Sequence, residues 1–204
     1  MHQLSPVEAR VLGTLMEKQH TVPDTYPMSL NAIVSGCNQK TSRSPVMEVT
    51  NGEAQAAIDS LKAANLVMES SGNRVARYSH NFERVLQVPS QSAAILAVLM
   101  LRGPQTAGEL RINGERLHSF ADISALQGFL QELAARPAAA LVVELPRQPG
   151  SREARWAHLL SGAPAVAPEP APPQARAPSD LEQRVARLEQ EVESLKAELS
   201  RIRS

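Results

Sequence analysis

A short motif occurs twice in the chain and limits the folds that it can adopt. Residues 74–80 read Arg-Val-Ala-Arg-Tyr-Ser-His, and residues 152–158, offset by 78 positions, read Arg-Glu-Ala-Arg-Trp-Ala-His. Further matches at nearby offsets pair residues 11–16 with residues 95–100, and residues 66–69 with residues 141–144. An offset that differs from one matched element to the next is expected when the copies of a duplicated unit gain and lose loop residues. The sequence therefore predicts two related domains of about 75–85 residues each, a size that commonly folds around one core.

Local signals predict the same order of elements in both copies. Helix starts are marked by a Ser or Thr cap followed three residues later by a carboxylate, a spacing in which each side chain accepts the other residue's backbone N–H. Such capping boxes begin at Ser5, Thr50, Thr106 and Ser179, and a weaker one begins at Ser119. After the third helix of each copy, β-branched runs flank a turn that contains glycine, which predicts hairpins within residues 66–80 and 141–158.

Three helices followed by a hairpin is the order of a winged helix. The expected fold is mainly α with small β-hairpins, in the α+β class: tandem winged helix-turn-helix domains at residues 1–88 and 89–160, with a C-terminal coiled-coil helix. The apolar positions expected in the core are Leu4, Val7, Val11, Leu12, Leu15 and Met16 of the first helix, and Ala57, Ile58, Leu61, Leu126, Phe129, Leu130 and Leu133 of the two third helices.

The C-terminal part of the chain has a different pattern. Twelve of the eighteen residues at 161–178 are Ala or Pro, which predicts a semi-extended linker because proline fixes φ and removes a backbone donor. In residues 179–204 apolar side chains repeat at alternating spacings of four and three, the heptad pattern of a coiled coil. The heptad positions are Leu181, Val185, Leu188, Val192, Leu195, Leu199 and Ile202.

Charges beside the heptads predict how these helices pair. In a parallel dimer, each g residue faces the e residue five positions on in the partner. The pairs are Arg184–Glu189, Glu191–Lys196 and Glu198–Arg203, and all three are opposite in sign. We therefore expect a parallel homodimer. The alternative is an amphipathic helix that folds back on the protein's own domains.

Several blocks of the sequence are similar to a known family. They are residues 4–12, 26–32, 37–40, 45–48, 101–106, 108–110 and 145–150. In these blocks the chain resembles the uncharacterised bacterial YceH-like family, over roughly residues 4–161. The resemblance implies a tandem winged-helix fold and implies no particular activity. The linker and the heptads lie outside the region of resemblance.

Composition narrows the classes of function. The chain has no run of about eighteen apolar residues that could span a bilayer. Its N-terminus has no basic stretch leading into an apolar one, so we expect a cytoplasmic protein without membrane contact. The single cysteine, Cys37, cannot form a disulfide within the chain or a thiolate metal cage. We expect neither a metal nor a cofactor.

Catalytic motifs are absent from the sequence. It has no glycine-rich phosphate loop, nucleophile elbow or ligand-spaced pair of histidines or carboxylates. Cys37, near the end of a predicted helix, is more typical of a small buried hydrophobe than of a nucleophile. His80 and His158 occupy matching positions of the repeat, which favours a structural role at the base of each hairpin. We expect that the protein is not an enzyme.

Double-stranded DNA is the first partner that the expected fold suggests. Winged helices place the third helix in the major groove and the hairpin on the backbone, and guanidinium groups pair well with phosphate. The residues expected to contact phosphate are Lys40, Arg43, Arg74, Arg77, Arg147, Arg152 and Arg155, and those expected to contact bases are Gln55 and Lys62. This hypothesis describes a dimeric, transcription-regulator-like protein.

Charge leads to an alternative function. The chain has 21 basic and 21 acidic residues, so its net charge is zero. The exposed face of the first predicted third helix combines Gln55, Asp59 and Lys62, and the second has no Lys or Arg before Arg136. Neither copy has the strongly basic surface of a typical DNA-binding domain. The alternative is an adaptor that binds another protein and has no significant affinity for DNA.

Overall fold

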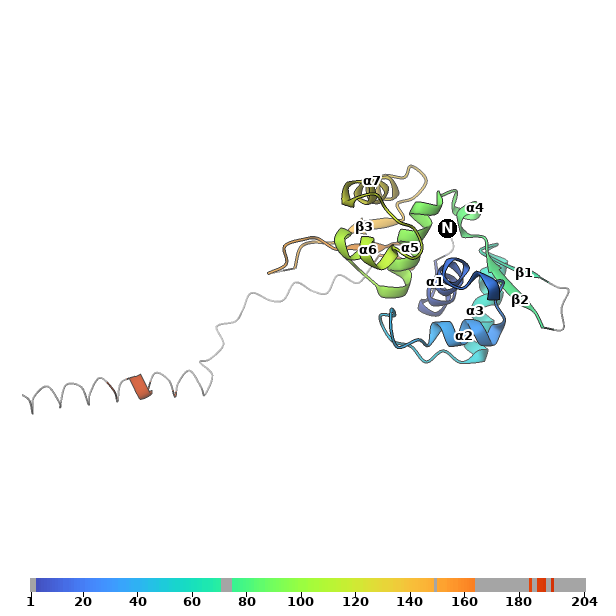
Figure 1. Cartoon of the computed structure of the whole chain (residues 1–204), viewed down its shortest axis with the longest axis horizontal. Coiled ribbons are helices and arrows are strands. Elements are labelled where there is room, and N and C mark those ends of the chain that lie inside the picture. The colour runs from blue at the N-terminus through green and yellow to red at the C-terminus, as the bar shows by residue number, and fades with distance from the viewer. Residues whose placement is uncertain are drawn as a thin grey trace, which may run out of the picture. The chain divides into compact units, whose positions relative to one another are not determined.

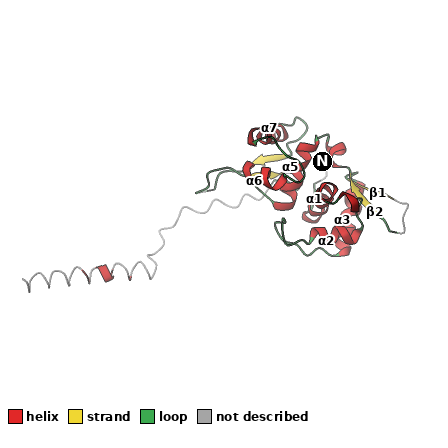
Figure 2. Ribbon diagram, in the orientation of Figure 1, coloured by secondary structure: helices red, strands yellow, loops and turns green. Residues whose placement is uncertain are grey.

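The computed structural model describes residues 3–70, 75–148 and 150–163, and in the C-terminal part residues 184, 187–189 and 192 (Figure 1). The chain divides into two units, Met1–Pro164 and Ala165–Ser204. In the first unit, helices form most of the regular structure and two antiparallel hairpins complete it (Figure 2). The expected α+β class, mainly helical with small hairpins, is therefore confirmed.

The elements follow the same order twice. Residues 3–88, here called the first half, contain α1 (Pro6–Thr21), the 3-10 helix η1 (Pro23–Thr25), α2 (Leu30–Cys37), α3 (Asn51–Ala63), β1 (Val67–Ser70), β2 (Arg77–His80) and α4 (Phe82–Leu86). Residues 89–163, the second half, contain α5 (Ser90–Arg102), α6 (Ala107–Gly114), α7 (Ile123–Ala134), β3 (Val142–Glu144) and β4 (Trp156–His158). In each half, three α-helices precede a hairpin.

Capping boxes position most of the predicted helix starts. Ser5, Thr50 and Thr106 each accept the N–H of a glutamate three residues on, whose carboxylate accepts the N–H of the capping residue. The prediction at Ser119 is wrong, because the carboxylate of Asp122 caps α7 by accepting the N–H of Ala125 at 2.8 Å. The expected box at Ser179 lies outside the described residues.

In each half, an isolated β-bridge joins the hairpin to the segment before the second helix. In the first half, Val67–Ser70 pair antiparallel with Arg77–His80, and Met28 forms a bridge with Tyr78 through N–H···O bonds of 3.0 and 2.8 Å. In the second, Gln105 forms the same bridge with Trp156, with bonds of 3.1 and 2.7 Å. Tyr78 and Trp156 are the matching aromatic residues of the repeat, so the repeated sequence specifies a repeated backbone arrangement.

The two halves share one core. Helices α1 and α5 pack side by side, and one continuous cluster of buried side chains includes residues of both halves. Gly13 permits this close approach, since a Cβ there would lie 3.0 Å from Leu101 Cγ and 3.3 Å from Met100 Cβ. The apolar positions predicted for the core are buried or packed against it. Independent folding of domains 1–88 and 89–160 remains a prediction.

Most of the C-terminal pattern lies outside the described residues. Arg184, residues 187–189 and Val192 are helical. The heptad residues Leu188 and Val192 are exposed in the single chain, whereas Leu181, Val185, Leu195, Leu199, Ile202 and the linker at 161–178 are outside the description. The coiled coil therefore remains a prediction.

Candidate functional site

Two arginines predicted to touch DNA donate hydrogen bonds to the segments that bridge to the hairpins. Arg77 Nη1 donates to the carbonyl of Pro27 at 2.8 Å, and the repeat-equivalent Arg155 Nη1 donates to the carbonyl of Pro104 at 2.8 Å. Each proline directly precedes the residue that bridges to the hairpin. Arg155 also forms a two-pronged ion pair with Glu109, with both N···O distances at 2.9 Å. The repeated arginines thus have a structural role that the DNA hypothesis did not include.

The structure places Arg43 in the interior, which corrects its expected role. Its side chain is 0% exposed, and its guanidinium contacts both carboxylate oxygens of Glu17, at 3.1 and 2.6 Å. Further bonds go to the carbonyls of Gly36, at 3.0 Å, and Ser42, at 2.9 Å. A buried guanidinium needs such partners, and these occupy the donors that a phosphate would require. The side chain of Arg43 is therefore not available to contact DNA phosphate.

Some of the other predicted DNA contacts are bonded to side chains of the protein itself, and others are exposed without such bonds. Lys62 forms an ion pair with Glu69, and Gln55 Nε2 donates to Asp59 Oδ1 at 3.0 Å. Lys40, Arg147 and Arg152 are exposed, with no hydrogen bond or ion pair to another described residue. Arg74 lies outside the described residues.

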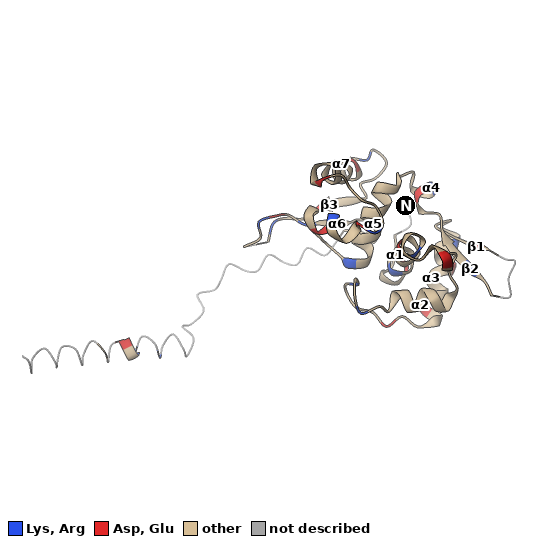
Figure 3. Cartoon of the chain, in the orientation of Figure 1, with Lys and Arg blue, Asp and Glu red and all other residues tan. Residues whose placement is uncertain are grey.

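The exposed faces of the two third helices are poor in positive charge. On α3, Glu53 and Asp59 are exposed, while Lys62 is neutralised by its ion pair. Along α7 the exposed polar residues are Ser124, Gln127, Gln131 and Glu132, and Figure 3 shows no basic position on this helix. These are the faces that DNA would have to approach. These faces carry hydrogen-bonding groups and acidic side chains, and they lack the basic side chains that would neutralise phosphate.

Isoleucines are exposed beside α7. Ile112 on α6 is 76% exposed and Ile123 at the start of α7 is 43% exposed. Gly108 lies one turn before Ile112, and a Cβ on Gly108 would lie 3.9 Å from Ile123 Cδ1, so the two isoleucines flank the same face. Ile123, Gln127 and Gln131 continue it at helical spacing along α7. We call Gly108, Ile112, Ile123, Gln127 and Gln131 the α6–α7 surface.

A polar pocket of about 270 Å³ opens where the two halves meet. It is lined by Ser42, Arg43, Ser44, Arg102, Pro104, Gln105, Glu109, Asn113 and Arg155. The structure thereby brings together Arg43 and Arg155, which lie 112 positions apart in the sequence. Arg102, Gln105 and Asn113 were not predicted from the sequence, although the first two belong to a block, residues 101–106, that carried the family resemblance.

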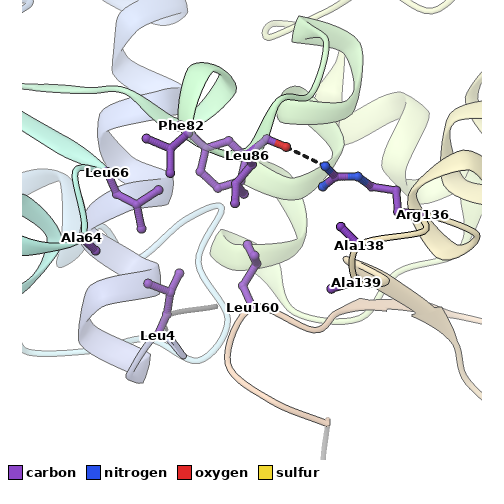
Figure 4. A pocket seen from close by; sticks show the side chains of 10 residues that line it. Leu4, Ala64, Leu66, Phe82, Leu86, Arg136, Ala138, Ala139 and Leu160 are labelled. Carbon is purple, nitrogen blue, oxygen red and sulfur yellow. Dashed lines mark hydrogen bonds between the residues drawn. The ribbon is translucent and has the colours of Figure 1, made fainter.

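A second pocket, of about 320 Å³, is mainly apolar (Figure 4). Leu4, Leu66, Phe82 and Leu86 of the first half face Leu160 and the alanines at 138 and 139. The polar side chain at its edge is Arg136, which donates to the carbonyl of Leu86 at 2.7 Å. This pocket offers van der Waals contact to a nonpolar group and little recognition chemistry beyond it.

The thiol is buried, and the repeated histidines are half-buried. Cys37 is fully buried beside Thr14, with 3.6 Å between Sγ and Oγ1, and burial raises the pKa of its thiol. This environment suits the predicted small hydrophobe and disfavours a thiolate. Burial also lowers the pKa of His80 and of His158 to about 4 in each case. Both rings are consequently neutral near pH 7.

No helix in the described part of the chain is both long and apolar enough to cross a bilayer. Within the same residues, no group of three or more His, Cys, Asp or Glu side chains is placed to hold a metal ion.

Comparisons with known proteins identify the family. The family model described as "Protein of unknown function, DUF480" matches residues 4–151. A UPF0502 protein of Dechloromonas aromatica (strain RCB) is 58% identical over 202 residues, covering 99% of this chain and 93% of the relative. UPF0502 proteins of Burkholderia pseudomallei (strain 668) and Burkholderia vietnamiensis are 56% and 63% identical, covering 100% and 79% of this chain and 86% and 68% of those relatives. The resemblance to an uncharacterised bacterial family is confirmed, and the chain belongs to the DUF480 (UPF0502) family.

Proposed function

We propose that this protein is an adaptor, built from two winged helices, that binds another protein through its α6–α7 surface. The winged-helix assignment rests on the order of three helices and a hairpin in each half. It is further supported by the isolated β-bridges that Met28 and Gln105 form with the hairpins. These features support the fold.

The single observation that carries the proposal is the chemistry of the α6–α7 surface. It combines the exposed side chains of Ile112 and Ile123 with the uncharged amides of Gln127 and Gln131. Cores of protein interfaces are depleted of charge in the same way. Burying an isoleucine side chain is worth about 1.5–3 kcal/mol. The partner is accordingly a protein whose surface offers an apolar patch with hydrogen-bonding groups at its edge.

A crosslinking experiment in the native host tests this proposal. A photoreactive amino acid placed at Ile112 should give a discrete crosslinked product with a second protein. The same label at Val46, an exposed apolar residue of the first half, should not. A product with the mass of two copies of this chain would assign the surface to self-association. If neither position gives a product, the adaptor proposal fails.

DNA binding is the second candidate, favoured by the exposed Arg147 and Arg152 on the turn of the second hairpin. Fluorescence anisotropy of a labelled duplex, measured over a range of salt concentrations, separates the two functions. Contacts to four phosphates predict a slope of log affinity against log salt of about −3.6. The double variant R147Q/R152Q should then make the slope shallower by about 1.8, since each phosphate contributes about 0.9. The adaptor proposal predicts no measurable binding even at low salt.

We further propose that the heptads at residues 179–204 join two copies in a parallel coiled coil. The alternating four-and-three spacing and the three opposite-charge pairs support this assembly. Deletion of residues 179–204 should lower the mass measured by light scattering from that of a dimer to that of a monomer. An unchanged mass would show that another surface sets the oligomeric state.

A further inference from the structure

The polar pocket joins segments that are distant in sequence. The loop before α3 contributes Ser42 and Ser44, and the end of α5 contributes Arg102. The two segments are bonded directly: the N–H of Ser44 donates to the carbonyl of Leu101 at 2.9 Å, and Arg102 Nη2 donates to Ser42 Oγ at 2.7 Å. A molecule held in this pocket would therefore contact both halves of the core.

Positive charge exceeds negative charge at this pocket. Arg43 is paired with Glu17, and Arg155 is paired with Glu109. Arg102 has no ion pair with any described residue, and its hydrogen bond there goes to the neutral hydroxyl of Ser42. Burial lowers the pKa of Arg102, while Glu17 raises it and the nearby Arg43 lowers it. The guanidinium of Arg102 is thus a partly enclosed cation that lacks a counter-charge in direct contact.

Two further observations point to a polar binding site here. Gln105 is only 5% exposed, its Oε1 accepts from Asn113 Nδ2 at 2.5 Å, and its buried Nε2 has no partner in the described structure. Buried donors are rarely left without an acceptor. Ser42, which positions Arg102, has φ of 60°, a left-handed conformation that is costly for a residue other than glycine and is often found where a ligand binds.

We propose that this pocket binds the oxyanion group of a small molecule, with Arg102 as the principal contact. A guanidinium presents parallel N–H donors that match the oxygens of a phosphate or carboxylate. Glu109 already occupies the fork of Arg155, so the anion lies toward the Arg102 side of the pocket. The site requires neither the adaptor function nor DNA binding. Its consequence is that a small anion stabilises the contact between the two halves.

Isothermal titration calorimetry of the full-length protein tests the site with two probes, inorganic phosphate and succinate, at constant ionic strength maintained with sodium chloride. We expect saturable binding of at least one probe, and the stronger one identifies the ligand group as phosphate or carboxylate. R102Q should weaken that binding at least about tenfold, the loss of roughly one charge-assisted contact. The matched control R116Q, at an exposed arginine outside the pocket, should bind like the wild type.

A second variant covers the case in which R102Q does not fold. S42A removes the hydroxyl that holds Arg102 while keeping the charge, and we expect it to weaken binding several-fold. The proposal is overturned if the wild type binds neither phosphate nor succinate saturably. It is also overturned if R102Q folds and binds with the wild-type affinity. If R102Q does not fold, wild-type affinity of S42A overturns it.

Discussion

Acid should destabilise this protein through its two repeated histidines, and His158 offers the cleaner measurement. Its ring is largely buried, Nδ1 has no partner among the described residues, and burial lowers its pKa to about 4. An unfolded chain restores a histidine pKa of about 6.5. Between these two values the unfolded state binds more protons than the folded state, so the free energy of unfolding rises with pH in this window.

The magnitude follows from the size of the shift. A difference of about 2.5 pKa units at about 1.36 kcal/mol per unit gives about 3 kcal/mol for one histidine. This stability is fully present above about pH 6.5 and is lost as the pH falls toward about 4. His80 should contribute a similar amount, because burial, with a smaller contribution from His20, lowers its pKa to about 4 as well.

Urea unfolding followed by circular dichroism, between about pH 7 and about pH 4, measures the effect. The variant H158Q carries a side chain that stays neutral, so its free energy of unfolding should fall with acid by about 3 kcal/mol less than that of the wild type. The control H118Q removes an imidazole that packs edge-to-face against Phe120, with 4.7 Å between the ring centroids. Parallel pH profiles for H158Q and the wild type would refute the argument from burial.

Three further substitutions test the packing. R43Q removes the buried cation from the half-buried Glu17, which keeps its ion pair with Lys18 at 3.3 Å, and should cost about 1–3 kcal/mol in urea unfolding; a loss below about 1 kcal/mol would contradict a stabilising role of the Arg43–Glu17 pair. L96A removes a fully buried side chain of α5 and should lower the free energy of unfolding by about 2–5 kcal/mol. If the two halves share one core, Trp156 fluorescence and circular dichroism should still report the same unfolding transition. T106A removes the cap of α6 and should cost about 1 kcal/mol, whereas an unchanged midpoint would show that the box contributes nothing.

The parts of the fold that could be predicted from sequence rest on local signals. The capping boxes at Ser5, Thr50 and Thr106 involve residues three positions apart, and the hairpins are marked by glycine-containing turns between β-branched runs. Ser119 shows the limit of this approach. It matched the spacing of a box, but Asp122, an equally good cap, lies directly before the helix.

Contacts between distant residues could not be predicted in this way. The arginines of the repeat bond to prolines about fifty positions earlier, and Arg43 pairs with Glu17 across 26 positions. A single polar residue carries no periodicity that shows whether it is buried. The shared core could have been inferred from the sequence of α5. Residues 93–101 are all apolar, and a helix that is apolar on every side is expected to lie at the centre of a fold.

The close approach of α1 and α5 at Gly13 has a consequence for whatever binds this protein. Neither half can rotate against the other unless the side chains between these helices separate from one another. A partner that contacts both halves must therefore present two epitopes at one fixed distance and angle. A substitution that loosens the packing of either half would alter the affinity of both epitopes together.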